Sequence, residues 1–179
     1  MRKSQVIILL LILGMVVSGF SDPDINHNYD GDYNLFKIER SRDADVVMYD
    51  VNLDSLGNLD AAKPISIYWK KHTESGRLAA ITSIQKKFGY GIKIQDLREN
   101  TVDFEIVSYK DQVFQLRKIS GGRYRVFTSS QGKEIEVTSL YIKFEDDSFW
   151  FPTVSRVEVQ GIDTDGGSQV SETITAYTK

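Results

Sequence analysis

The chain has 179 residues, of which 41% are hydrophobic and 26% are charged, which is enough for one domain with a sizeable core and too short for two. It contains no cysteine, which excludes disulfides, thiolate nucleophiles and sulfur-ligated metal sites. Its formal net charge of −3 argues against a nucleic-acid-binding protein, which needs a basic face.

The first 19 residues have the pattern of a secretory signal peptide. Arg2 and Lys3 precede an apolar run from Val6 to Val17, which is shorter than the roughly 20 residues of a membrane-spanning helix, and the small residues Ser18 and Gly19 follow. We therefore expect an exported protein, periplasmic or extracellular, with no transmembrane span in the mature chain. An uncleaved amino-terminal anchor is the alternative. A lipoprotein is excluded because no cysteine is available for acylation.

Two further segments follow the predicted signal peptide. Residues 20–34 are rich in Asp, Asn and Ser and have no periodicity, so we expect a flexible mature N-terminal segment. Residues 35–179 are expected to form a single β-rich domain. Removal of the leader leaves 20 basic and 25 acidic side chains, a net charge of about −5.

Three strands are predicted between Leu35 and Lys71. The first covers Leu35 to Glu39 and ends at a polar turn from Arg40 to Asp45. In the second, apolar and polar residues alternate along the strand. Its apolar positions are Val47, Tyr49, Val51 and Leu53, and its polar positions are Asp50, Asn52 and Asp54. A turn at Ser55 to Asn58 follows, and Pro64 begins the third strand. One face of this strand holds Ile65, Ile67 and Trp69, and the other holds Ser66, Tyr68 and Lys70.

One helix is predicted from Arg77 to Phe88. Leu78, Ile81, Ile84 and Phe88 repeat near the helical period. Gly89 stands where a left-handed cap would end such a helix.

The remaining chain reads as a series of strands. Two-residue alternation occurs around positions 90–95, 102–108, 113–119, 124–128, 134–144, 154–161 and 169–176. Short turns such as Gly121-Gly122 and Gln131-Gly132 join several of them. In the 134–144 segment the apolar phase changes near Thr138-Ser139, which predicts a bulge or corner. We expect a mainly β fold: an antiparallel meander of about ten strands that forms a barrel or sandwich, with the one short helix between strands.

The acidic loop is a candidate calcium site. Asp50, Asn52 and Asp54 have the spacing of oxygen ligands in calcium loops, and Asp60 could close the site. A helix-loop-helix calcium site would instead need Gly and Glu where this chain has Ser55 and Ala61. The alternative is that these side chains form a solvated strand edge that needs no metal.

Four residues are candidates for ligand binding: Arg40, Tyr68, Lys70 and Tyr90. Tyr68 and Lys70 share one face of a strand, and a closed barrel would turn one face of that strand toward its interior. Tyr90 stands between Gly89 and Gly91, where the backbone could approach a ligand closely or form a tight turn. Arg40 lies in a polar segment that folding does not require.

Two other features have both a structural and a functional interpretation. His72 could act as a base or ligand, or be an ordinary solvated residue. The aromatic cluster of Phe149, Trp150 and Phe151 could plug the core under a loop or form an exposed binding patch. We predict the core plug.

Four segments, in order, resemble a bacterial family classed as domain of unknown function 4833: FKIERS, YDVNLDSLGNLD, PISIYW and KKFGYGIK. The resemblance covers most of residues 36–94 and is weaker afterwards. It implies an exported bacterial protein and brings no catalytic residue, cofactor or substrate.

Three functions are compatible with these observations. The first is an exported, non-enzymatic domain that binds a small molecule or a protein, without a cofactor. The second is a carboxylate-dependent hydrolase or lyase, with Asp50, Asp54, Lys70 and Tyr90 as its candidate residues. The third is a structural cell-envelope protein that exposes sheet edges to partners.

Overall fold

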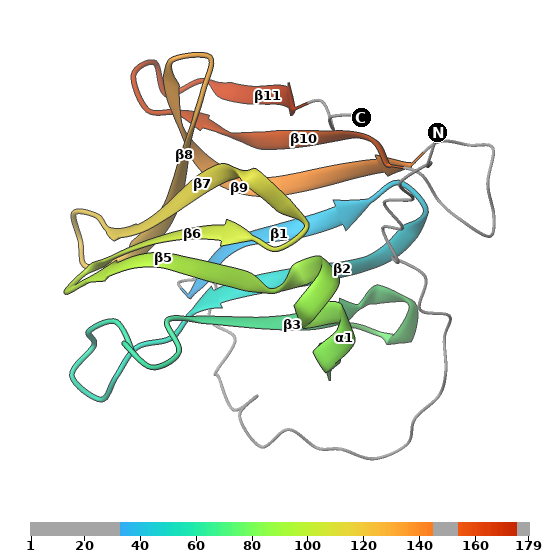
Figure 1. Cartoon of the computed structure of the whole chain (residues 1–179), viewed down its shortest axis with the longest axis horizontal. Helices are drawn as coiled ribbons and strands as arrows, with labels where there is room; N and C mark the ends of the chain where they lie inside the picture. The colour runs from blue at the N-terminus through green and yellow to red at the C-terminus, as the bar shows by residue number, and fades with distance from the viewer. Residues whose placement is uncertain (1–32, 145–153, 175–179) are drawn as a thin grey trace, which may run out of the picture.

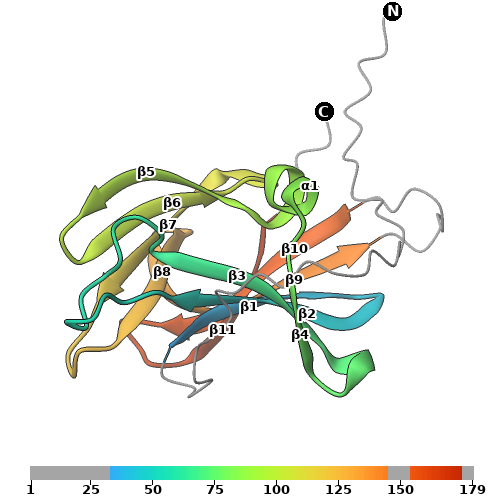
Figure 2. The ribbon, with the colours of Figure 1, turned by 90° about the horizontal axis from the view of Figure 1, so that it is seen from below.

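A computed structural model of the chain describes residues 33–144 and 154–174, apart from the side chain of Asp111. In this part, eleven strands belong to one sheet, whose path is β4-β3-β2-β1-β9-β8-β7-β6-β5. Strands β10 and β11 continue from the opposite edge of β9. The sheet curls into a half-barrel (Figure 1), and the view from below shows its two arms (Figure 2).

The first arm contains the three strands predicted between Leu35 and Lys71. Its strands are β1 Asn34–Arg40, β2 Asp43–Val51, β3 Ile65–Lys71 and β4 Arg77–Ala80. The predicted alternation of β2 is confirmed for its apolar face, since Val47, Tyr49 and Val51 are buried. A one-turn 3-10 helix, η1 His72–Glu74, connects β3 to β4.

The second arm is a meander of hairpins. Its strands are β5 Ile92–Arg98, β6 Thr101–Ile106, β7 Tyr109–Lys118, β8 Tyr124–Ser130 and β9 Lys133–Phe144. The hairpin β10 Val154–Asp163 and β11 Gln169–Ile174 follows. Neighbouring strands of this arm pair antiparallel, as predicted.

Strand β9 joins the two arms and departs from the predicted meander. Its first part pairs antiparallel with β8, and Ser139 to Ile142 then pair parallel with β1. The sheet is therefore mixed, not purely antiparallel. The phase change predicted near Thr138 is confirmed: Thr138 is the extra residue between the Val137–Gly161 and Ser139–Gln160 pairs. This bulge lets β9 leave β8 and pair with β1.

The core fills the interior of the half-barrel with aromatic rings. Phe36 stacks on Tyr49, with ring centroids 4.3 Å apart, and lies 6.3 Å from Phe114, which in turn lies 5.7 Å from Phe104. Phe36 and Tyr49 belong to the first arm, and Phe104 and Phe114 to the second. All four rings are fully buried, so this stack holds the two arms together.

The predicted helix from Arg77 to Phe88 is wrong over its first half. Residues Arg77–Ala80 form β4 and pair with β3. The helical segment comprises α1 Ser83–Gln85 and the π-helical turn η2 Lys86–Tyr90. It begins at a capping box: the N–H of Gln85 donates to the Thr82 hydroxyl at 3.2 Å, and the N–H of Thr82 donates to the Gln85 side chain at 3.0 Å. Gly89 lies inside η2 and is not a left-handed cap.

Several predictions fall outside the described residues. These are the signal peptide in residues 1–19, nearly all of the 20–34 segment, and the aromatic cluster around Trp150. Among the helices of residues 33–144 and 154–174, none has the length and apolar character needed to cross a membrane.

Candidate functional site

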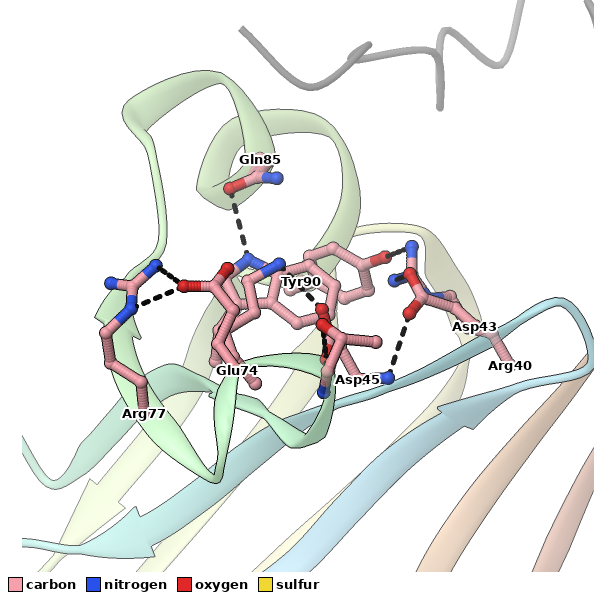
Figure 3. Close-up of polar contacts among 10 residues, drawn as sticks. Arg40, Asp43, Asp45, Glu74, Arg77, Gln85 and Tyr90 are labelled. Carbon is pink, nitrogen blue, oxygen red and sulfur yellow. Dashed lines mark hydrogen bonds and ion pairs between the residues drawn. The ribbon is translucent and has the colours of Figure 1, made fainter. Parts of the chain in front are cut away.

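A cluster of cations and aromatic rings lies where β1, β3 and the helical segment meet (Figure 3). The Arg40 guanidinium carbon lies 4.6 Å from the centroid of the Trp69 ring. Its Nη1 donates to the Tyr90 hydroxyl at 3.1 Å, and its Nη2 pairs with Asp43. The Tyr90 ring meets Trp69 edge-on, with centroids 5.3 Å apart. We call Arg40, Trp69 and Tyr90 the anchor cluster.

A second cation lies over the same indole ring. Lys71 Nζ is 4.8 Å from the Trp69 ring centroid and 2.9 Å from Asp45 Oδ2. Asp45 also accepts hydrogen bonds from the backbone N–H and the hydroxyl of Thr73, at 3.1 and 2.9 Å. Burial raises the pKa of Asp45, but the hydrogen bonds from Lys71 and Thr73 outweigh it and hold the pKa below its ordinary value.

The anchor cluster fixes the helical segment to the sheet. Trp69 Nε1 donates to Gln85 Oε1 at 3.4 Å, and the Tyr49 hydroxyl donates to the Tyr90 carbonyl at 2.6 Å. The N–H of Gly91 closes the π-helical turn on the Lys86 carbonyl at 3.0 Å. A Cβ on residue 91 would lie 2.1 Å from that oxygen, so only glycine fits. The close approach predicted for this glycine is therefore to its own chain.

Burial keeps the two tyrosines of this region neutral. It raises the pKa of Tyr49 well above its ordinary value, and neighbouring Tyr90 adds to this. Burial also raises the pKa of Tyr90, although Arg40 lowers it and Asp43 raises it further. Both hydroxyls thus remain hydrogen-bonding groups and are not bases at neutral pH.

One hydrogen-bond donor of the anchor cluster has no acceptor. Arg40 Nε is buried and has no acceptor among the described residues.

The structure brings together two of the four predicted ligand-binding residues. Arg40 and Tyr90 are in contact. Tyr68 and Lys70 alternate with Trp69 along β3 and therefore lie on the opposite face of the sheet. There, the Tyr68 hydroxyl donates to Asp50 Oδ2 at 2.7 Å. No single site is lined by all four.

Of the three side chains that could have formed a solvated strand edge, Asp50 and Asn52 are buried, while Asp54, beyond the end of β2, is exposed. Asp50 and Asn52 are 4% and 6% exposed. Asp50 Oδ1 accepts from Asn34 Nδ2 at 2.9 Å, and Asn52 Oδ1 accepts from the Ser66 hydroxyl at 2.9 Å. Neighbouring strands supply these donors, which is how carboxylate and amide groups tolerate burial. Alternation along one strand cannot reveal such cross-strand partners.

The other proposed calcium ligands also accept hydrogen bonds. Asp54 Oδ1 accepts from the N–H groups of Leu56 and Asn58, and Asp60 Oδ1 accepts from that of Ala62. No group of three or more His, Asp or Glu side chains in the described residues could hold a metal ion. Calcium binding stays a prediction.

The remaining candidates lie apart from one another. Asp50 is on the Tyr68 face of the sheet and Tyr90 is on the Trp69 face, while Asp54 caps an exposed turn. His72 is the exposed first residue of η1. The groups considered for acid–base chemistry thus do not converge on one point.

Four exposed apolar side chains lie on the helical segment and on β5. They are Ile84, Phe88, Ile94 and Leu97, which are 51%, 52%, 40% and 39% exposed. We call these four residues the edge strip. They are half of the eight large hydrophobic side chains exposed in the described residues. The sequence suggested that Ile84 and Phe88 belong to a buried helix face, but of that predicted face only Ile81 is buried.

Three lysines accompany the edge strip. Lys86, Lys87 and Lys93 are exposed, and none of them has an ion pair within the described part of the chain. Lys87 Nζ lies 5.2 Å from the Phe88 ring centroid. Three cations without an ion pair in the described residues therefore lie close in sequence to the edge strip, although the chain as a whole is acidic.

Comparison with known proteins gives one match. A family model described as a domain of unknown function, DUF4833, matches residues 36–173, most of the chain. No curated protein and no solved structure matches the sequence or the fold.

Proposed function

Because the chain belongs to the DUF4833 family, whose description names no activity, we propose from its geometry that it is an exported, non-enzymatic protein-binding domain. The partner binds the edge strip, which consists of Ile84, Phe88, Ile94 and Leu97. The observation that carries this proposal is the concentration of exposed apolar side chains in one segment. Exposed apolar side chains that gather in one segment are typical of an interaction site.

The anchor cluster supports this function by holding the binding surface still. Ile84 and Phe88 are four residues apart and lie on one side of the helical segment. The same segment is tied to the sheet through Gln85 and Tyr90. A surface fixed in this way loses little conformational entropy when a partner binds.

A protein partner is favoured over a small molecule in the barrel interior. The rings of Phe36, Tyr49, Phe104 and Phe114 occupy that interior. Tyr68, which could have lined it, is hydrogen-bonded on the other face. The exposed edge strip is the better candidate for recognition.

A matched pair of variants tests this function. Phe88→Ser removes the most exposed ring of the edge strip, and Val113→Ser removes an apolar side chain of similar exposure, 46%, from β7. Both variants should fold like the wild type, because exposed sites change stability by only about 0.5 kcal/mol. In affinity capture from the source cell's envelope fraction, wild type and Val113→Ser should retain the same proteins and Phe88→Ser should lose them. Equal capture by all three would contradict the proposal.

Export is a separate part of the proposal, and the leader-like pattern of residues 1–19 supports it. The chain should be recovered from the periplasm or the medium with an amino terminus at Phe20. Recovery of the uncleaved chain from the cytoplasm would contradict export. It would not bear on the binding proposal, which the capture experiment tests.

A further inference from the structure

Strand β5 ends the path of the sheet and has a free edge. It pairs with β6 on one side, and no strand in residues 33–144 or 154–174 pairs with its other side. Six of its seven residues are exposed. Figure 2 shows β5 at the margin of the sheet, with α1 beside its beginning. A free edge presents unpaired N–H and C=O groups that another strand can bind.

The ladder with β6 identifies the free backbone groups. The N–H of Val107 donates to the Gly91 carbonyl at 2.8 Å, so that carbonyl faces β6. Antiparallel ladders alternate, so the backbone groups of Ile92 and Ile94 face away from β6. The register shifts at Gln95, so the second half of β5 is read from the hairpin turn. A two-residue turn joins Arg98 to Thr101, and these two residues form the hydrogen-bonded pair next to it. The backbone groups of Leu97, one residue earlier, therefore face away from β6.

The side chains at these positions suit an added strand. Ile94 and Leu97 lie opposite the buried Phe104 and Val102 of β6. The residues whose N–H groups face away from β6 therefore also carry the apolar side chains, which extend the core surface toward the free edge of β5. A partner strand could cover both side chains while its backbone pairs with β5.

The charges favour a particular partner. Lys93 lies within β5, and Lys86 and Lys87 lie just before it. The one acidic residue of β5, Asp96, is engaged by Arg98 at 3.0 Å. A second copy of this chain pairing through β5 would thus offer Lys93 no free carboxylate, and lysines and bulges on edge strands oppose self-association. A partner with its own acidic side chains satisfies the lysines.

We propose that β5 accepts an extended segment of a partner protein as an added β-strand, and that this segment alternates apolar and acidic residues. This inference rests on the proposed binding function and specifies its partner. Strand addition requires backbone pairing and charge complementarity, whereas binding through the edge strip alone requires only its exposed apolar side chains.

The first experiment tests backbone pairing with a short synthetic peptide that alternates valine and glutamate. Ile94→Pro and Ile94→Ala both remove the isoleucine, but only proline removes the outward N–H, and it leaves the ladder with β6 intact. Ile94→Pro should bind the peptide about tenfold more weakly than Ile94→Ala, the loss expected for one hydrogen bond. In case Ile94→Pro fails to fold, a peptide methylated on alternate backbone nitrogens should lose binding to the wild type by a similar factor.

The second experiment tests the charge. Lys93→Glu should weaken binding of the valine–glutamate peptide and strengthen binding of a matched valine–lysine peptide. This exchange of preference controls for any general loss of folding, which would weaken both.

Three results would overturn the inference. Equal binding by Ile94→Pro and Ile94→Ala, together with binding of the methylated peptide, would exclude strand addition. A preference of the wild type for the lysine peptide, or no binding of either peptide, would exclude an acidic partner segment. A concentration-dependent dimer of the wild type that Ile94→Pro abolishes would make a second copy the occupant. The loss of capture by Phe88→Ser tests the binding function separately from all three.

Discussion

The anchor cluster and the edge strip are neighbours in sequence but have opposite environments. Tyr90 is 3% exposed, and four residues later Ile94 is 40% exposed. In the anchor cluster, aromatic faces and hydrogen bonds meet partners within the chain. In the edge strip the side chains are largely exposed, and one backbone edge of β5 pairs with no strand of the described residues. The residues of the anchor cluster therefore stabilise the fold, while those of the edge strip are available to a partner.

The largest expected effect is on the anchor cluster. Trp69→Ala removes a buried ring that contacts Arg40, Lys71 and Tyr90, and should lower the free energy of unfolding by about 3–5 kcal/mol. Urea denaturation measures it. A loss below about 1 kcal/mol would mean that the cluster does not hold the helical segment, and the contrast with the edge strip would fail.

A second effect concerns the turn that carries Tyr90. Gly91→Ala forces a Cβ against the Lys86 carbonyl and should cost about 1–3 kcal/mol, as overpacking does. Gly166→Ala is the matched control, because the nearest atom to its added Cβ would be 3.8 Å away. Equal melting temperatures for the two variants would contradict the account of the turn.

Asp45 should make stability depend on acid pH. Its pKa is lower in the folded chain than in the unfolded chain, so the carboxylate stabilises the fold above its unfolded pKa, and this contribution is lost as the pH falls through the folded value. Asp45→Asn should cost about 1–2 kcal/mol at pH 7, and the difference from wild type should shrink below about pH 4. A pH-independent difference in urea denaturation would argue against the ion pair with Lys71.

The edge strip should show the smallest change in stability. Ile84→Ser with Phe88→Ser should change the free energy of unfolding by no more than about 1 kcal/mol, about 0.5 for each exposed site. The same double variant should abolish capture of the partner. A large loss of stability would show that these side chains support the fold, which would remove the distinction between the two regions.

We expect no calcium binding at the predicted site in the acidic loop. Asp50 and Asn52 are already hydrogen-bonded within the chain, so millimolar calcium should release no heat in calorimetry and leave the melting temperature unchanged. A clear rise in melting temperature would restore the acidic loop as a functional site.

The sequence predicts what depends on local pattern. Alternation placed Val47, Tyr49 and Trp69 in the core, and the phase change located the bulge at Thr138. The helix was misplaced because Leu78 and Ile81 fit a helical period as well as an edge strand followed by a turn. The capping box at Thr82 and Gln85 was the local signal that marks the true start.

Other features depend on contacts between distant residues. The Arg40–Tyr90 hydrogen bond joins residues 50 positions apart, and the parallel pairing of β1 with β9 spans about twice that separation. The burial of Asp50 depends on Tyr68 and Asn34 of neighbouring strands. A single sequence carries no pattern for such pairs, so Arg40 and Tyr90 could be named as candidates but not placed in contact.

Amide hydrogen exchange with and without the valine–glutamate peptide would show directly whether β5 accepts an added strand. We expect the N–H groups of Ile92, Ile94 and Leu97 to exchange rapidly in the free protein and to become protected when the peptide binds. The amides of β11, which pairs only with β10 among the described strands, should not change. Peptide binding that leaves the β5 amides unprotected, or that protects β11 instead, would rule out strand addition at β5.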